Sequence, residues 1–308
     1  MLNQRALTYL NEVIRRGSLR RAAAYLDVDA SALSRHIKTL EEELGIQLCE
    51  RHGGGMRATQ AGQLLVQHFH AQRAQEEAVL SQLMEMQGLT RGDVRIAVGE
   101  GFIADLIAAP LGVFMSTFKD INVEIRMAGV NEAMSLVKER EVDLALLYAP
   151  PVSPYLWSHV ETRQPLDLIV PPNHPLCQLK RPLGLGDLDG FPLGLMGNPF
   201  GMRQMVNMVA HQERIHLEAR LSTNSVAVLK NFVRSGIGVT FMPELTVTDE
   251  IQRGEIRALP MKYPVLNGAR AQIVSLKGQD LTVAASTCVA HLQNGMRFFS
   301  ADAPRLLQ

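Results

Sequence analysis

One glycine-rich stretch of the sequence has the spacing of a nucleotide-binding turn. Gly99-Glu100-Gly101-Phe102-Ile103-Ala104 follows a predicted strand and matches G-x-G-x-x-G/A, in which glycines let backbone N–H groups approach a pyrophosphate. The same chemistry needs an acidic side chain at the end of the next strand to hold the ribose, and that strand ends Arg126-Met127-Ala128. A nucleotide-dependent enzyme is therefore the minor alternative. The turn can instead offer free N–H groups at a helix N-terminus to a carboxylate or another small polar ligand.

Catalytic and metal-binding motifs are otherwise missing from the sequence. It contains neither His-Glu-x-x-His nor Gly-x-Ser-x-Gly, and no Gly-Lys-Ser/Thr follows the triple glycine at 53–55. Two histidine pairs lack further ligands at metal spacing, and three cysteines are too far apart for a zinc motif or a disulfide framework. We therefore expect no catalytic residue, no metal site and no cofactor. The histidine pairs are His68 with His70 and His211 with His216, and the cysteines are Cys49, Cys177 and Cys288.

Small polar and basic side chains follow one face of a helix predicted from Asp29 to Leu44. Asp29 can cap this helix, and leucine and isoleucine recur along one buried stripe. The opposite face carries hydroxyl and cationic groups, which can contact phosphates and base edges. The predicted stripe is Leu33, Ile37, Leu40 and Leu44, and the polar face is Ser31, Ser34, Arg35 and Lys38.

The elements around this helix predict a helix-turn-helix with a wing. A first helix ends at Gly17, Ser18 caps a second helix over 19–26, and 27–29 form a turn. Residues 51–57 then read as a turn between two short extended pieces. A small helical bundle is the alternative, and the polar helix face followed by a wing favours the DNA-binding motif. Apolar residues recur at helical spacing in the first helix, at Leu7, Leu10, Val13 and Ile14.

A long helix is predicted from Thr59, which can cap it, to about Gly88. Apolar residues alternate by four and three along it, which is the seam of a coiled coil, with two polar interruptions. The alternative is an amphipathic helix packed on its own chain. The predicted seam is Leu65, Phe69, Gln72, Glu76, Val79, Leu83 and Met86.

The remaining two-thirds of the chain alternate strands with helices, an α/β pattern for which we expect mostly parallel sheets. One helix is predicted to run through Phe118, others over 202–211 and 225–235, and a last helix extends to Phe298. The predicted strands are 94–98, 123–127, 143–148, 166–170, 191–195, 220–222, 238–241 and 271–276.

The composition indicates a globular protein, but its net charge does not indicate a nucleic-acid partner. The chain is 46% hydrophobic and 20% charged, which is typical of globular domains. Its length of 308 residues is sufficient for two or three domains. The 31 basic and 31 acidic side chains cancel, and residues 1–62 hold nine Lys or Arg against seven Asp or Glu. A secretory signal and an apolar run of membrane-spanning length are both missing, so we expect a cytoplasmic protein with no membrane partner.

The N-terminal motifs resemble those of the LysR-type transcriptional regulators. The resemblance is carried by Gly-Ser-Leu-Arg-Arg-Ala-Ala-Ala-Tyr-Leu at 17–26 and Ser-Ala-Leu-Ser-Arg-His-Ile-Lys-Thr-Leu-Glu-Glu-Glu-Leu-Gly at 31–45, and is extended by 48–51 and 57–62. Looser matches follow at 92–96, 174–176 and 233–243. Two positions depart from the family pattern: Cys49 stands where Phe is usual, and the glycine-rich wing tip lacks the basic residue often found there.

The resemblance implies an α/β protein with an all-α-type winged helix-turn-helix at its N-terminus and two Rossmann-like subdomains that resemble periplasmic binding proteins. It implies a DNA-binding domain at 1–62, a dimerisation helix at 59–88, and an effector-binding domain at 89–308. Subdomain one would be 91–163 with 268–308, and subdomain two 164–267. Expected partners are double-stranded DNA, a small-molecule effector, RNA polymerase and further copies of the chain, as a homodimer and then a homotetramer. The DNA-facing residues would be Ser31, Ser34, Arg35, Lys38, Arg51 and Arg57.

The resemblance also implies an effector cleft between the two subdomains. Glu100 stands where many relatives have Ser or Thr, which favours a ligand with a donor or positive group, and Arg203 could bind a carboxylate. A polar or amphoteric effector is therefore expected, unless Glu100 and Arg203 pair with each other or point into solvent. A solute-binding protein is a further alternative, contradicted by the DNA-binding motif. The predicted effector residues are Glu100, Gly101, Phe102, Tyr148, Phe200, Arg203, Ser222, Thr223 and Asn224.

Overall fold

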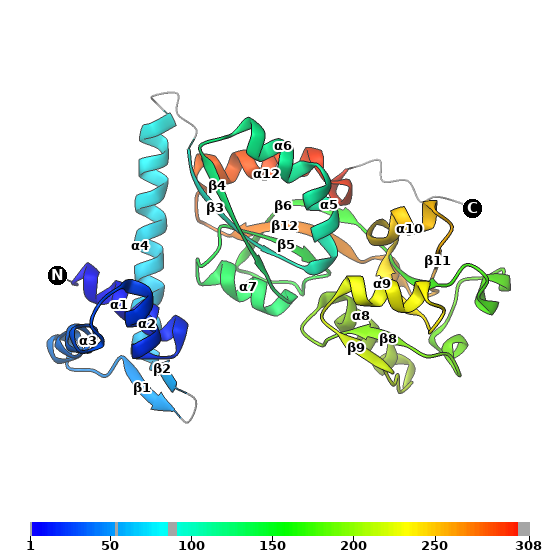
Figure 1. Ribbon diagram of the computed structural model, residues 1–308, viewed down its shortest axis with the longest axis horizontal. Coiled ribbons are helices and arrows are strands. Elements are labelled where there is room, and N and C mark those ends of the chain that lie inside the picture. The colour runs from blue at the N-terminus through cyan, green and yellow to red at the C-terminus, as the bar shows by residue number, and fades with distance from the viewer. Residues whose placement is uncertain (1, 53–54, 86–90, 301–308) are drawn as a thin grey trace. The chain divides into compact units, whose positions relative to one another are not determined.

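The computed structural model describes residues 2–52, 55–85 and 91–300, the side chains of 84 and 85 excepted. The chain divides into two compact units, Met1–Val79 and Leu80–Gln308. Figure 1 shows short helices, a hairpin and most of a long helix in the first unit, and sheets covered by helices in the second.

The first unit is a winged helix-turn-helix, as predicted. The left-handed C-cap Gly17 (φ 62°) ends the first helix, and the Ser18 side chain accepts from the Arg21 backbone N–H to begin the second. Asp29 occupies the N-cap of the third helix but makes no side-chain capping bond there. The elements are α1 (Gln4–Arg16), α2 (Leu19–Leu26), α3 (Ala30–Leu44), β1 (Cys49–His52), β2 (Gly55–Ala58) and the start of α4 (Gln60–Glu85).

The core of the first unit lies where α1, α2 and α3 meet. Leu33, Ile37 and Leu40 are buried as predicted, but Leu44 is 42% exposed, so its predicted burial was wrong. Leu44 is the last residue of α3, directly before the αL C-cap Gly45, and lies past the buried stripe.

Helix α4 has two different apolar faces along its length. Thr59 caps it, since its Oγ1 accepts from the Gly62 N–H at 3.1 Å. Phe69 is buried in the core of the first unit, whereas Val79 is 52% and Leu83 is 53% exposed. The first half of the predicted seam therefore packs on its own chain, and Met86 and Gly88 lie outside the described residues.

A five-stranded mixed sheet organises one part of the second unit. Strand β3 is parallel to β4 and β5, and β12 is antiparallel to β5 and β6. Helices cover both faces, with α6 and α12 on one and α7 on the other (Figure 1). The order is β4 (Ile121–Met127), β3 (Gly92–Val98), β5 (Leu144–Tyr148), β12 (Arg270–Leu276) and β6 (Leu156–Arg163), with α5 (Ile103–Ala108), α6 (Pro110–Thr117), α7 (Val130–Lys138) and α12 (Val283–Gly295).

The other part of the second unit contains two smaller sheets. Strand β7 pairs antiparallel with both β10 and β11, while β8 and β9 pair parallel to each other. The strands are β7 (Leu166–Val170), β8 (Gly194–Met196), β9 (Leu221–Thr223), β10 (Thr240–Pro243) and β11 (Arg257–Leu259), and the helices are α8 (Gly201–Glu213), α9 (Val226–Arg234), α10 (Thr248–Gln252) and α11 (Pro264–Asn267).

The expectation of mostly parallel sheets was wrong. Among the named strands in the described part of the second unit, four pairings are antiparallel and three are parallel, because β12 returns to the first sheet between β5 and β6, and β7 lies between two antiparallel neighbours. The single helix predicted through Phe118 is also wrong: the chain breaks at Ala109 and restarts with Pro110 at the first position of α6.

Candidate functional site

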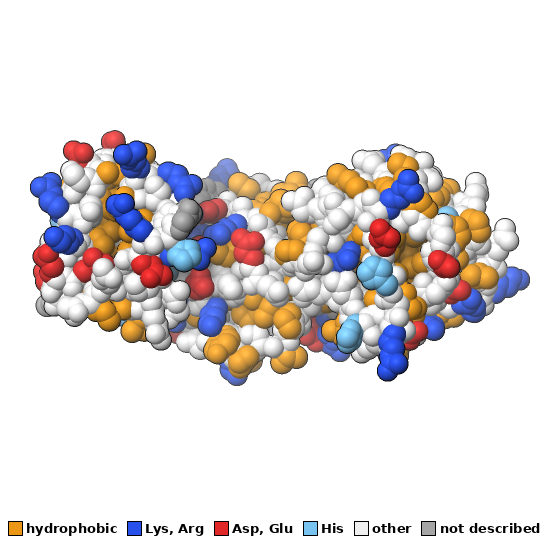
Figure 2. All heavy atoms as spheres, turned by 90° about the horizontal axis from the view of Figure 1, so that it is seen from below, with side chains coloured by type: hydrophobic (Ala, Val, Ile, Leu, Met, Phe, Trp, Pro, Cys, Tyr) orange, Lys and Arg blue, Asp and Glu red, His pale blue; other side chains and the backbone are white. Residues whose placement is uncertain are grey.

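The polar face predicted on α3 lies on the surface of the first unit. Ser31, Ser34, Arg35 and Lys38 are all exposed, and Arg35 has no ion pair or hydrogen bond within the described residues. Lys38 Nζ lies 3.6 Å from the Glu42 carboxylate, an exposed pair that is weak and readily exchanged. Figure 2 shows the first unit at the left, with Lys and Arg side chains mixed among Asp and Glu, as the near-neutral local charge predicts.

The wing is the antiparallel pair β1–β2, and it presents Arg51 and Arg57 to solvent. Glu41 anchors it, because its Oε1 accepts from the backbone N–H groups of Leu48 at 2.7 Å and Cys49 at 3.1 Å. Glu41 is therefore an intramolecular partner of the wing. The wing tip at 53–54 lies outside the described residues.

Two of the three cysteines are buried thiols with little nucleophilic character. Burial raises the pKa of Cys49 to about 12, with Glu41 adding to the shift, and burial with Asp143 raises the pKa of Cys288 to about 12. At neutral pH both stay protonated, and the thiolate is the reactive form. Cys177 is half-buried.

We therefore expect a chromogenic disulfide reagent at pH 8 to titrate one thiol rapidly in the native chain and all three in denaturant. Cys177→Ser removes the fast phase, because the other two thiols are buried and protonated. Retention of that phase in Cys177→Ser contradicts the assignment.

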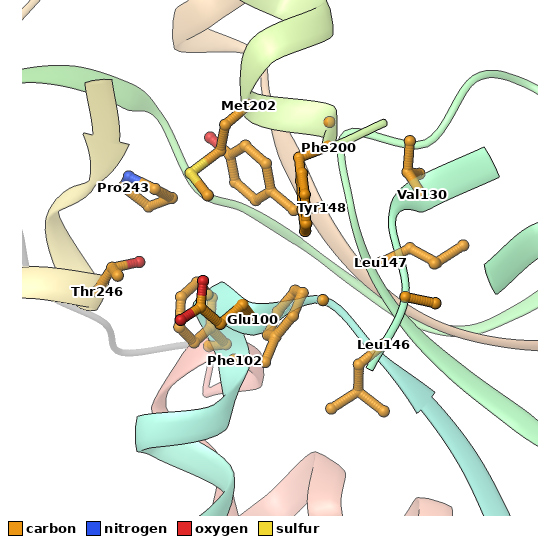
Figure 3. A pocket seen from close by; sticks show the side chains of 15 residues that line it. Glu100, Phe102, Val130, Leu146, Leu147, Tyr148, Phe200, Met202, Pro243 and Thr246 are labelled. Atoms are coloured by element: carbon orange, nitrogen blue, oxygen red, sulfur yellow. The ribbon is translucent and has the colours of Figure 1, made fainter. Parts of the chain in front are cut away.

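A small pocket lies in the second unit between the carboxyl ends of β3 and β5 and the smaller sheets. Its free space is about 30 Å³ for the centres of water molecules, roughly two waters. Gly201 lies directly against the end of β5, since a Cβ there would lie 2.0 Å from the Tyr148 carbonyl oxygen. Figure 3 shows the lining, which comprises Gly99, Glu100, Gly101, Phe102, Ala128, Val130, Leu146, Leu147, Tyr148, Phe200, Gly201, Met202, Pro243, Thr246 and Phe298.

The structure brings five of the nine predicted effector residues to this pocket: Glu100, Gly101, Phe102, Tyr148 and Phe200. The other four do not line it. Arg203 Nε donates to Asn207 Oδ1 at 2.8 Å, and Thr223 Oγ1 accepts from the Ser225 N–H at 3.1 Å. Ser222 and Asn224 are exposed.

Glu100 bridges the pocket to the N-terminus of α9. Its Oε1 accepts from Ser225 Oγ at 3.1 Å, and its Oε2 accepts from the backbone N–H of Val226, the first residue of the helix. The positive end of the helix dipole favours a carboxylate at this position. Glu100 therefore neither pairs with Arg203 nor points freely into solvent.

Two further hydroxyls face the pocket, and they differ in their partners. The Tyr148 hydroxyl donates to the Gln164 carbonyl at 2.8 Å, and burial, followed by the charge of Asp167, raises the pKa of Tyr148 well above its usual range. Thr246 Oγ1 is buried and has no hydrogen-bond partner among the described residues. Thr246 was missed from the sequence, where Met242-Pro243-Glu244 gives no sign that the next turn faces the cleft.

Other kinds of site find no support in the described residues. They contain no group of three or more His, Cys, Asp or Glu that could hold a metal ion. Within the same residues no single helix is long and apolar enough to cross a membrane, and only the bent pair Glu100–Ala108 with Pro110–Thr117 reaches the length and composition jointly.

Two family models match the chain in the order of its two units. The bacterial regulatory helix-turn-helix protein, lysR family, matches residues 4–63, and the LysR substrate binding domain matches residues 87–297. Together they cover most of the chain, which therefore belongs to the LysR family of transcriptional regulators.

Individual relatives agree with this assignment. The transcriptional dual regulator GltC of Bacillus subtilis is 26% identical over 92% of this chain and 93% of its own length. A variant of full-length OxyR from Pseudomonas aeruginosa has a TM-score of 0.71 at 18% identity, covering 100% of this chain and 99% of that one. Full-length CbnR in complex with its target DNA has a TM-score of 0.59 at 16% identity, covering 96% and 100%. The two structures share the fold of this chain.

Proposed function

We propose that α3 enters the major groove of an operator and that the wing flanks it on the phosphate backbone. The observation that carries this is the row of exposed polar groups on α3, of which Lys38 has only a weak surface ion pair, set on a helix whose opposite face is core. In this proposal Arg35 contacts a guanine edge or a phosphate, and Lys38 exchanges Glu42 for a phosphate. The proposed DNA-binding residues are Ser31, Ser34, Arg35, Lys38, Arg51 and Arg57.

We infer that the pocket lined by Glu100 and Thr246 is the effector site. Residues 91–163 with 268–308 form subdomain one and residues 164–267 subdomain two, which agrees with the strands each sheet contains. Effector binding changes the fit of the two subdomains, and this shifts the population of DNA-bound shapes. The domain boundaries in this proposal are 1–62, 59–88 and 89–308.

Assembly through α4 completes the proposed function. Val79 and Leu83 leave an apolar face on α4 that a second copy covers, and two linked modules bind two half-sites far more tightly than one. The chain then acts as a homodimer or homotetramer in the cytoplasm, contacting RNA polymerase and catalysing no reaction itself.

The Arg35→Ala variant tests the DNA-binding face. If Arg35 contacts a base, we expect specific binding to weaken by about 1–3 kcal/mol while random duplex binding changes little. If it contacts a phosphate, both affinities fall and the salt slope drops by about one. A duplex selected from a random library, titrated by fluorescence anisotropy at several salt concentrations, separates these results.

Lys119→Ala is the matched control, since it removes one exposed cation from the second unit. We expect it to leave the affinity and the salt slope unchanged. Equal behaviour of Arg35→Ala and Lys119→Ala contradicts the placement of α3 on DNA. Absence of any selected sequence contradicts the proposed function.

A further inference from the structure

The charge of the pocket differs from that of a site built for anions. Glu100 carries the only formal charge on the walls that the structure describes, and no Lys, Arg or His lines them. Arg203, the cation predicted to reach a carboxylate, is bonded to Asn207 instead. A free anion entering this pocket would meet one negative charge and no compensating cation.

The helix end that could attract an anion is already occupied. Ser225 Oγ and the Val226 N–H both donate to Glu100, so the chain supplies its own carboxylate to the start of α9. An anionic ligand would have to displace this carboxylate and leave it nearby as a repelling charge. A cationic ligand is attracted instead, because the Glu100 carboxylate is already in the pocket as its ionic partner.

A second feature of the pocket is the Thr246 hydroxyl, which lacks a hydrogen-bond partner in the described part of the chain. Thr246 is 94% buried, given an exposed fraction of 6%, and its Oγ1 makes no hydrogen bond among the described residues. Figure 3 shows this hydroxyl pointing into the cavity, on the side where the Glu100 carboxylate lies. Buried hydroxyls without partners are rare because each forgoes a hydrogen bond that water would supply.

The rest of the pocket is apolar and aromatic. Phe102, Phe200 and Phe298 contribute rings, and Met202 and Leu146 fill the remaining wall. Aromatic faces attract organic cations and also cover their hydrocarbon parts. An ammonium group carried on a short apolar body therefore matches the carboxylate, the free hydroxyl and the rings together.

Resting on the effector site proposed above, we propose that the effector is a small organic amine. Its ammonium group donates to the Glu100 carboxylate and to Thr246 Oγ1, and its apolar part lies among Phe102, Phe200 and Met202. The amine competes with Ser225 and Val226 for Glu100, so binding loosens the bond that joins the two sides of the cleft. Because the pocket has room for only about two waters, an amine of this size fits only after this loosening.

The test uses the full-length chain and ligands matched in shape but not in charge. Butylamine and benzylamine are each compared with the corresponding alcohol and carboxylate, by thermal shift and by isothermal calorimetry at constant ionic strength. We expect the amines to raise the melting temperature, the alcohols to bind more weakly and the carboxylates not to bind. Preference for a carboxylate, or no stabilisation by either amine, overturns the proposal.

Three variants separate a binding role from a structural one. Glu100→Gln weakens amine binding by about tenfold or more, since the ammonium group loses its ionic partner and keeps only a hydrogen bond to a neutral amide oxygen; it weakens alcohol binding less, because the alcohol never formed an ion pair. Thr246→Val raises the melting temperature of the ligand-free chain, because it removes an unpaired buried hydroxyl, and weakens amine binding. Glu124→Gln, an exposed carboxylate outside the pocket, changes neither.

Unchanged amine affinity in Glu100→Gln overturns the proposal even if amines bind the chain elsewhere. Lower stability of ligand-free Thr246→Val together with full amine affinity overturns the role of the hydroxyl. Each of these results leaves sequence-specific DNA binding intact, so it is distinguishable from failure of the proposed function, which is measured with DNA alone.

Discussion

Phe102→Ala should destabilise the second unit by about 3–5 kcal/mol, the cost of removing a fully buried aromatic ring. Phe102 is 1% exposed, and its ring centroid lies 4.7 Å from that of Phe298 and 6.0 Å from that of Phe299. The lost ring leaves a cavity beside the pocket and takes the support from both partner rings. The loss of stability is smaller only if the turn Arg297–Phe299, which carries both partner rings, moves inward and fills this cavity.

The only tryptophan of the chain makes this loss measurable. Trp157 lies on β6, so its fluorescence during urea unfolding follows the second unit. Ile107→Ala is the matched control, because Ile107 is 54% exposed on the neighbouring helix and its loss should cost less than about 0.5 kcal/mol. Similar urea midpoints for the two variants would show that the ring contacts of Phe102 with Phe298 and Phe299 contribute little to the stability of the second unit.

The elements predicted best are those that local signals define. Gly17 and Ser18 end and begin helices through bonds within a few residues, and the α3 stripe follows helical periodicity, so the sequence alone places them correctly. The exposed Leu44 shows the limit of periodicity: it continues the pattern but lies where the packing ends.

Strand pairing depended on contacts that are distant in sequence. Strand β6 follows no simple alternation of buried and exposed residues, and β11 has three half-buried residues, so neither has a clear period-two signal. The partner of β6 is β12, more than a hundred positions later, and no local pattern shows that this pairing is antiparallel.

Only some of the pocket residues could be predicted, again because others come from segments that are distant in sequence. Glu100 could be found because the glycines beside it mark a turn after a strand, whereas Thr246 and Phe298 reach the pocket from distant segments of the chain. Arg203 was expected at the cleft because it begins a helix, but its guanidinium bonds along that helix to Asn207. The direction of a long side chain is set by neighbours that the sequence does not identify.

Gly62→Ala should have the second large effect, in the first unit, although glycine to alanine usually stabilises a helix. Gly62 is in the first turn of α4, where an added Cβ would lie 2.0 Å from the Leu48 backbone oxygen. That oxygen also accepts the Thr59 N–H at 3.0 Å, so the backbone leading into β1 must move and lose this bond. We expect a loss of about 3 kcal/mol, the upper part of the range for overpacking.

Circular dichroism during urea unfolding measures this loss, and the selected duplex measures its consequence for DNA binding, because displacing β1 also displaces the wing. Gly112→Ala is the control of opposite sign: Gly112 is also helical, but a Cβ there meets nothing within 4 Å, so it should gain about 0.5–1 kcal/mol. If Gly62→Ala also gains stability and keeps its DNA affinity, the Leu48 carbonyl is not what requires glycine at this position. If only Gly112→Ala gains, close approach of the Leu48 backbone explains the glycine in the first turn of α4.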